Sequence, residues 1–312
     1  MNGVLIVAKE KGYTSHDVVA RLRGILHQKK IGHTGTLDPD ATGVLPVCLG
    51  NATKLCDFLT DKRKTYEAVM LLGMTTDTYD TSGVMLTKTD PSHVTPEALR
   101  DVMGSFLPGY DQVPPMVSAK KVDGKRLYEL ARKGITVERK AVPVTLSDLK
   151  ILSVDLPRVR FQITCSKGTY IRSLIHDMGQ RLQCGAVMED LVRLSASGYD
   201  LKDALTLDEI EARTQAGTIG EVLIATDAVL GEYPALQTEA AADALLSNGN
   251  PFPEKMAKRR EVNITQPKSA AEVDIIHNGH PVRVYDSAGK FAGLFRYDKG
   301  SRMFRVVKMF PE

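Results

Sequence analysis

One stretch of the chain gathers residue types that could do chemistry on a bound molecule. From Ile31 to Gly50 it reads IGHTGTLDPDATGVLPVCLG, with the acid Asp38 directly before a proline. Proline fixes its own φ and pushes the residue before it out of the helical region, which predicts a bend that projects the Asp38 carboxylate. A carboxylate on a rigid loop suits nucleophilic or acid–base catalysis. The alternative is that Asp38 only caps the turn.

The elements on either side of this stretch would hold the Asp38 loop. Ser15 predicts the start of a helix to about Gln28, with apolar residues on one face. The apolar run Val44 to Leu49 predicts a buried strand after the loop. A phosphate-binding loop is a third interpretation, but neither G-x-G-x-x-G nor G-x-x-x-x-G-K-[ST] is present.

A second group of candidate residues lies on or next to predicted strands. Tyr66 falls on the β-rich run Lys64 to Leu72, where a tyrosine is commonly part of the packing. Arg158 to Cys165 alternates apolar and polar residues, which predicts a half-buried strand, and a helix follows. Tyr170 and Arg172 lie at that strand-to-helix junction. Arg172 is either a structural ion-pair residue or the cation that keeps a buried functional carboxylate ionised.

The strongest local basic surplus lies between residues 118 and 140. This stretch contains eight Lys or Arg residues and three acids, and an amphipathic helix is predicted around Leu127. The surplus indicates phosphate contact, although a merely solvated face is the alternative. The basic residues are Lys120, Lys121, Lys125, Arg126, Arg132, Lys133, Arg139 and Lys140.

Composition limits the class of protein. The 312 residues, 43% hydrophobic and 25% charged, are typical of a globular chain with one large domain and a smaller one. A net charge of +3 does not by itself indicate nucleic-acid binding. Four cysteines without a C-x-x-C pair argue against a zinc ribbon and favour a reducing, cytoplasmic setting. No apolar run is long enough to span a membrane, and no secretory signal is expected.

The C-terminal part of the chain has a different pattern. We place a domain boundary near Gly231, which divides the chain into residues 1–230 and 231–312. Val273 to Phe310 shows short β-rich runs broken by glycine turns, the pattern of a small barrel. His277 and His280, which flank Asn278-Gly279, indicate a turn rather than a metal site.

These motifs together resemble a known family. The loop GHTGTLDPDATGVLPVCLG is similar to the signature of the TruB family of tRNA pseudouridine synthases. Further segments similar to the family follow in its order, and the resemblance spans roughly residues 3 to 215. They are Gly3 to Ser15, Lys64 to Val69, Pro114 to Gly134 and Cys165 to Leu174. The C-terminal barrel resembles a short PUA-type RNA-binding domain.

The resemblance implies a fold and an activity. The expected fold is α+β, with a mixed, largely antiparallel sheet flanked by helices and a small PUA-like barrel at the C-terminus. The expected activity is the isomerisation of uridine 55 in the T loop of tRNA, without cofactor or metal. An insertion at about residues 113–141 would grip the T arm. We expect a monomer that binds the tRNA T stem-loop and no membrane.

The resemblance also assigns roles to individual residues. Asp38 would act on the flipped-out nucleotide with Arg172 as its partner, while Tyr66 would stack on the base and help transfer its proton. The substrate pocket would be completed by His33, Lys9, Tyr170 and Leu191. Contacts to the RNA backbone would come from Lys120, Lys121, Lys125, Arg126, Arg132 and Lys133.

Four residues depart from the family pattern: Ala8, Glu10, Asp40 and Val117. Ala8 and Glu10 flank Lys9 and put its role in doubt, whereas Asp40 is expected to face solvent. Two alternative functions stay open. One is a tRNA-binding or tRNA-folding module whose catalysis is secondary or lost, and the other is a guide-RNA-dependent pseudouridine synthase of the dyskerin type.

Overall fold

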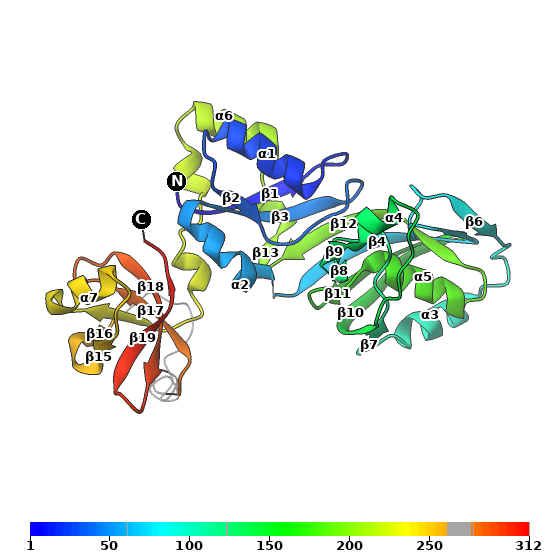
Figure 1. The fold of residues 1–312 in the computed structure, drawn as a ribbon. Coiled ribbons are helices and arrows are strands. Elements are labelled where there is room, and N and C mark those ends of the chain that lie inside the picture. The colour runs from blue at the N-terminus through cyan, green and yellow to red at the C-terminus, as the bar shows by residue number, and fades with distance from the viewer. Residues whose placement is uncertain (61, 123, 261–275, 277, 312) are drawn as a thin grey trace.

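A computed structural model describes residues 1–311 except 61, 123, 261–275 and 277, and it does not describe the side chains of Lys121 and Arg126. Within these ranges the chain forms a long central sheet flanked by helices, and a separate C-terminal sheet at one end (Figure 1).

The central sheet has nine strands, and every neighbouring pair is antiparallel except β3 with β12. This confirms the expected mixed, largely antiparallel sheet. The main order is β1 (Gly3–Lys9), β3 (Thr42–Leu49), β12 (Ala186–Ala196), β4 (Lys64–Leu72), β11 (Arg158–Cys165), β10 (Val142–Asp155) and β7 (Gly109–Gln112). Two short strands, β2 (Ile31–His33) and β13 (Tyr199–Asp200), pair with β3 and β12.

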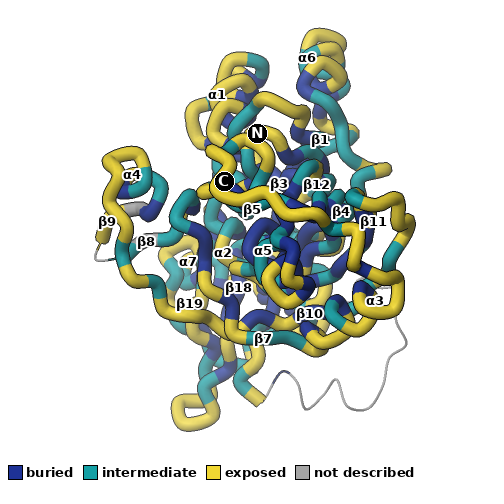
Figure 2. Tube along the Cα trace, turned by 90° about the vertical axis from the view of Figure 1, so that its right-hand side faces the viewer, coloured by how far each residue is buried: buried dark blue, intermediate teal, exposed yellow. Residues whose placement is uncertain are grey.

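Helices cover the sheet in two groups, each over its own apolar core. α1 (Ser15–Ile25) and α6 (Leu207–Gln215) pack on the β1 and β3 end. α3 (Pro96–Gly104) and α5 (Ile171–Arg181) pack on β4, β11 and β12. The buried apolar residues of α1 and α5 recur every three or four positions, as the sequence periodicity predicts. Figure 2 shows this buried interior enclosed by exposed turns and helix faces.

The first helix begins one residue earlier than the prediction that Ser15 is its N-cap. Thr14, not Ser15, is the N-cap, because Thr14 and Asp17 form a reciprocal capping box. Ser15 is instead fully buried and bonds to the Asp38 loop. The helix ends at Ile25, before the predicted Gln28.

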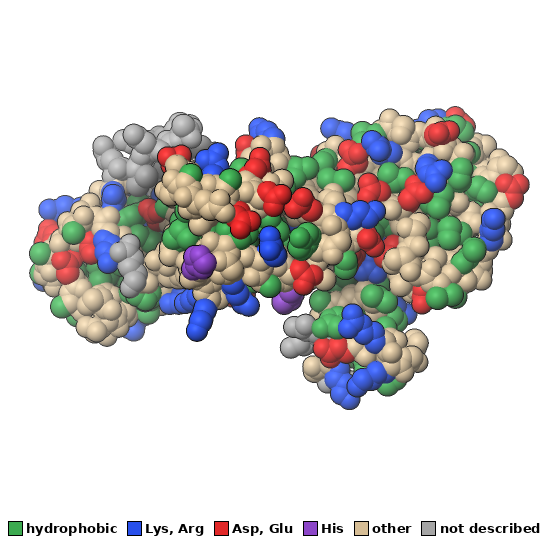
Figure 3. Space-filling view, turned by 90° about the horizontal axis from the view of Figure 1, so that it is seen from above, with side chains coloured by type: hydrophobic (Ala, Val, Ile, Leu, Met, Phe, Trp, Pro, Cys, Tyr) green, Lys and Arg blue, Asp and Glu red, His purple; other side chains and the backbone are tan. Residues whose placement is uncertain are grey.

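The basic segment, residues 113–141, leaves the body of the protein. It contains the two-residue strands β8 (Lys121–Val122) and β9 (Lys125–Arg126) and the short helix α4 (Leu127–Ala131). These elements stand away from the central sheet (Figure 2). Seen from above, they form a lobe with Lys and Arg side chains on its surface (Figure 3).

A six-stranded sheet forms the C-terminal region, in the order β15-β19-β18-β17-β14-β16. Its strands are β14 (Ala235–Thr238), β15 (Phe252–Pro253), β16 (Ala257–Arg259), β17 (Pro281–Tyr285), β18 (Phe291–Asp298) and β19 (Met303–Met309), with helix α7 (Asp243–Ser247) beside them. The last three were expected from the β-rich pattern, whereas the first three were not singled out. Residues 273–275 and His277 lie outside the described residues.

The remaining elements are short. Helix α2 (Cys56–Thr60) precedes β4 in the chain. A hairpin of β5 (Met74–Thr76) and β6 (Met85–Lys88) follows β4. Single 3-10 turns cover Gly50–Leu55, Leu201–Asp203, Ile219–Val222, Ala228–Leu230, Ala240–Ala242 and Glu254–Met256. Among the described residues, no helix combines the length and apolar character that crossing a membrane requires.

Candidate active site

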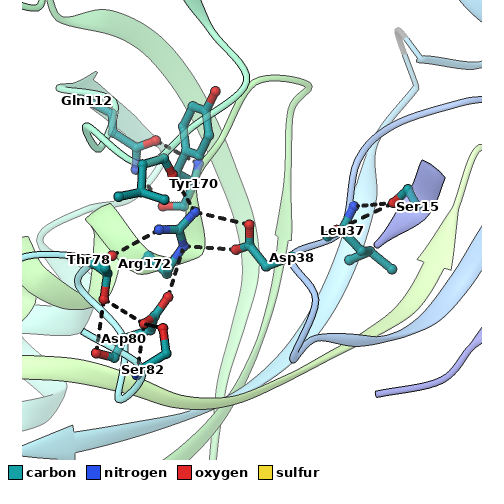
Figure 4. Close-up of polar contacts among 10 residues, drawn as sticks. Ser15, Leu37, Asp38, Thr78, Asp80, Ser82, Gln112, Tyr170 and Arg172 are labelled. Atoms are coloured by element: carbon teal, nitrogen blue, oxygen red, sulfur yellow. Dashed lines mark hydrogen bonds and ion pairs between the residues drawn. The ribbon is translucent and has the colours of Figure 1, made fainter. Parts of the chain in front are cut away.

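Asp38 and Arg172 form a two-pronged ion pair between the predicted loop and the start of α5. Arg172 donates from Nε to Oδ2 at 2.8 Å and from Nη2 to Oδ1 at 3.1 Å (Figure 4). The arginine is 4% exposed, while the Asp38 side chain is 37% exposed. The cation is therefore buried and fixed, and the carboxylate that it orients still faces open space.

Arg172 is held on its other sides by groups from two further segments. Nη1 donates to the Thr78 carbonyl and Nη2 to the Val117 carbonyl, both at 2.9 Å. Asp80 Oδ2 lies 3.7 Å from Nε and adds a second carboxylate. Figure 4 shows Thr78 and Asp80 in one turn below the guanidinium. Nothing in the sequence distinguishes Asp80, because it belongs to an acidic turn of the kind common on protein surfaces.

Lys9 holds the Asp38 loop from beneath. Its ammonium donates to the carbonyls of Ala41, Pro39 and Glu10 at 2.6, 3.0 and 3.0 Å, and the residue is 1% exposed. Burial lowers the pKa of Lys9 to about 8, although Asp38 and Asp40 act in the opposite direction. Lys9 thus lies next to the predicted site, but it does not line the cavity beside Asp38.

Arg193 holds the two ends of the same loop. This fully buried residue of β12 donates from Nε to the Val44 carbonyl at 2.6 Å and from Nη2 to the Gly35 carbonyl at 3.3 Å. Gly43 makes the approach of β3 to β12 feasible, since its φ is +109° and a Cβ there would lie 2.2 Å from the Arg193 carbonyl oxygen. Sequence reasoning missed Arg193, because nothing in its neighbourhood indicates which strand β12 joins.

A cavity of about 320 Å³ opens beside the Asp38 carboxylate. Its wall contains four of the other predicted residues, Tyr66, Tyr170, Arg172 and Leu191, and also Ser118 and Arg193. Burial raises the pKa of the Tyr66 phenol, and the neighbouring Arg193 cation partly opposes that shift. Burial also raises the pKa of Tyr170. The cavity therefore joins an ion-paired carboxylate, two neutral phenols and an apolar wall.

The Tyr170 backbone is fixed by a single amide side chain. Gln112 accepts from the Tyr170 N–H at 2.8 Å and donates to the Tyr170 carbonyl at 3.0 Å. Tyr170 is also the residue before the first turn of α5. The start of α5, with Tyr170 and Arg172, is consequently locked against the end of β7.

His33 lies on β2, outside the cavity wall. Its ring meets His16 edge-on with centroids 5.2 Å apart, and its Nδ1 is buried without a hydrogen-bond partner. Burial lowers the pKa of His33 to about 4, with smaller contributions from His16 and Arg193. The imidazole is therefore neutral near pH 7.

The structure describes the side chains of four of the six residues predicted to contact RNA phosphates. Lys125, Arg132 and Lys133 are exposed, and Lys120 is half-buried. The side chains of Lys121 and Arg126 lie outside the described residues. Ser118 and Ala119, at the base of the same segment, reach the cavity wall. Asp40 is exposed, as expected.

Other candidate sites are weaker. A groove of about 780 Å³ between α1 and α6 is larger than the Asp38 cavity, but it contains none of the predicted site residues. Within the described ranges, no three His, Cys, Asp or Glu side chains gather as metal ligands would. His280 is exposed and His277 lies outside those ranges.

Comparison with known proteins places the chain in a family. Residues 23–171 match the N-terminal domain of TruB family pseudouridylate synthases, and residues 172–230 match the C-terminal domain of tRNA pseudouridylate synthase B. The chain is 46% identical to the tRNA pseudouridine synthase B of Lachnoclostridium phytofermentans, over 99% of this chain and 100% of that one. This chain belongs to the TruB family. It is also 42% identical to the Geobacter sulfurreducens synthase, over 98% and 99% of the two chains.

Solved structures agree with the TruB fold. The chain superposes on a Cbf5-Nop10-Gar1 complex with a TM-score of 0.70 at 24% identity, covering 99% of this chain and 85% of that one. An H/ACA RNP bound to a substrate RNA that contains 2′-deoxyuridine gives 0.69 at 22% identity, with the same coverage. At these identities the likeness establishes the fold of this TruB family member and nothing further.

Proposed function

We propose that this chain isomerises uridine 55 in the T loop of tRNA to pseudouridine, with the Asp38 carboxylate as the reacting group and no cofactor. The observation that carries the proposal is the Asp38–Arg172 ion pair at the mouth of a cavity that Tyr66 also lines. A guanidinium with two hydrogen bonds to a carboxylate favours its ionised form and fixes its orientation. The relatives named tRNA pseudouridine synthase B support the same reaction.

The reaction breaks the N1–C1′ bond, turns the uracil, and joins C5 to C1′ while the C5 proton is lost and N1 gains one. An ionised Asp38 assists either by adding to the base or by acting at the sugar as uracil departs. Both routes need one carboxylate oxygen free to face the nucleotide, and the 37% exposure of the Asp38 side chain provides it. The Tyr66 phenol, which lines the same cavity, would help transfer the C5 proton.

The target base has to leave the stacked loop before it enters the cavity. Extruding a base costs about a few kcal/mol, and stacking on an aromatic side chain recovers roughly 1–3 kcal/mol. Tyr66 would supply that stacking, with Tyr170 and Leu191 as the remaining walls. His33, neutral and outside the cavity, would hold the RNA from which the base was removed. Lys9 would act indirectly, by holding the Asp38 loop in place.

The basic segment would bind the T stem-loop. Its exposed cations are Lys125, Arg132 and Lys133, and Ser118 and Ala119 at its base form part of the cavity wall. Figure 3 shows Lys and Arg side chains on the surface of this lobe. Residues 231–312 would serve as a PUA-like RNA-binding domain next to the catalytic domain 1–230. We further propose that the protein acts as a monomer in the cytoplasm, where its tRNA substrate is found.

The deciding experiment uses a T-arm stem-loop carrying tritium at C5 of the target uridine. The wild-type chain should release the label without any guide RNA, and Asp38→Asn should bind the stem-loop with unchanged affinity but release none. Label release by Asp38→Asn would contradict the role of the carboxylate. A wild-type chain that only binds would indicate a tRNA-folding module, and activity that requires a guide RNA would indicate the dyskerin-type alternative.

A further inference from the structure

Ser118 carries a buried hydroxyl that no described group satisfies. The residue is 5% exposed, its Oγ has no hydrogen-bond partner, and it lines the same cavity as Asp38 and Tyr66. The Tyr170 phenol is close enough for a hydrogen-bond contribution from Ser118 to lower its pKa, against the larger effect of burial. The two hydroxyls are therefore neighbours, but no partner of Ser118 Oγ has the distance and angles of a formed hydrogen bond.

A buried polar group without a partner is unfavourable and uncommon in folded proteins. When such a group faces a cavity, a ligand that enters the cavity is the natural source of the missing partner. A serine hydroxyl donates one hydrogen bond. Uracil offers two carbonyl oxygens as acceptors, so an extruded uracil carries the complementary group at its edge.

The backbone around Ser118 is held in place by hydrogen bonds on both sides of the residue. The Ser118 N–H donates to the Met116 carbonyl at 3.0 Å, and the Ser118 carbonyl accepts from Tyr128 N–H at 3.0 Å. The preceding carbonyl, of Val117, accepts from Arg172. Ser118 is thus fixed to the same guanidinium that orients Asp38, and a residue positioned in this way is suited to read a ligand.

We propose that Ser118 donates a hydrogen bond from Oγ to a carbonyl oxygen of the extruded uracil and so determines how the base sits against Asp38 and Tyr66. This inference rests on the proposed function and adds a contact to it. The basic segment then has two parts: exposed cations that bind the RNA backbone, and at its base a hydroxyl that binds the nucleobase.

The test compares the wild-type chain, Ser118→Ala and Ser118→Cys on three T-arm stem-loops whose target is uridine, 2-thiouridine or 4-thiouridine. Sulfur accepts hydrogen bonds poorly. We expect Ser118→Ala to slow single-turnover conversion of uridine roughly tenfold, the value of one hydrogen bond, with little change in the dissociation constant of the RNA. On the thio substrate that replaces the contacted oxygen, wild type and Ser118→Ala should react at the same rate. Ser118→Cys, which keeps the size but donates weakly, should fall between them.

Thr226→Val is the matched control, because it removes a buried hydroxyl that donates to Asn51 Oδ1 at 3.3 Å and does not line the cavity. It should leave the uridine rate unchanged. Equal rates for wild type and Ser118→Ala on uridine would overturn the inference alone. So would the same loss on all three substrates, since that pattern indicates a structural role. A wild-type chain that converts no stem-loop would overturn the proposed function and the inference with it.

Discussion

Arg172 donates from a single nitrogen, Nη2, to the Asp38 carboxylate at 3.1 Å and to the Val117 carbonyl at 2.9 Å. The loop that carries the reacting carboxylate and the base of the RNA-binding segment therefore meet at one guanidinium. Because both contacts share a donor group of fixed planar shape, a shift of the segment changes the geometry of the ion pair. RNA binding and catalysis are linked at this point in the proposed mechanism.

Arg172→Lys should reduce activity strongly although it keeps the charge. An ammonium cannot reproduce two parallel bonds to Asp38 together with bonds to the Thr78 and Val117 carbonyls. We expect the single-turnover rate to fall by about 10²-fold, in the range for loss of a preorganised electrostatic contact. The matched control is Arg160→Lys, an exposed arginine paired with Glu67. An Arg172→Lys rate within threefold of wild type would contradict the need for a planar partner.

Lys9→Met should destabilise the protein and impair the chemical step more than RNA binding. The substitution leaves the Pro39 and Ala41 carbonyls without their buried donor, which we expect to cost about 3 kcal/mol in the free energy of unfolding. The loosened Asp38 loop should lower kcat with little change in KM. Urea unfolding and steady-state kinetics measure the two effects, with exposed Lys202→Met as the control. An increase in KM at unchanged kcat would show that Lys9 binds substrate instead.

His33 should make stability depend on pH in the acid range. Its pKa is about 4 in the folded chain against 6.5 for an unperturbed histidine, so between these values the unfolded chain binds a proton that the folded chain does not. The free energy of unfolding should therefore fall as pH drops from 6.5 to 4. His33→Phe should lack this contribution. Urea unfolding of both proteins at several pH values measures it, and a constant difference between them would refute it.

Neutralising lysines of the basic segment, exposed Lys125 and Lys133 and half-buried Lys120, should weaken RNA binding and reduce its salt dependence. Lys120→Gln, Lys125→Gln and Lys133→Gln combined remove three cations, and each phosphate contact contributes about 0.7 to 0.9 to the slope of log K against log salt. The slope should fall by about 2, as measured by filter binding of the T-arm stem-loop. Lys88→Gln, on exposed β6, is the control. An unchanged slope would remove the segment from the RNA interface.

Much of the secondary structure could be predicted because it is encoded locally. The predicted strands Lys64 to Leu72 and Arg158 to Cys165 coincide with β4 and β11. β-rich composition predicted the first, and alternation of apolar and polar residues, which reports burial of one face, predicted the second. The first helix shows the limit of such reasoning. Ser15 and Thr14 are both good caps in isolation, and only the packing of Ser15 against Leu37 assigns the cap to Thr14.

Three features of the site are encoded locally: Asp38 lies on a stiff bend, Tyr66 lies on a strand and Arg172 lies in the first turn of a helix, because proline geometry and apolar periodicity act over a few residues. The contact between Arg172 and Asp38, 134 residues apart, arises only when the whole chain folds. Tertiary folding also places Asp80, Arg193 and Ser118 around them. These neighbours depend on which strands pair and which loops fold back, and a chain encodes that through the energy of its whole core, not through any local pattern.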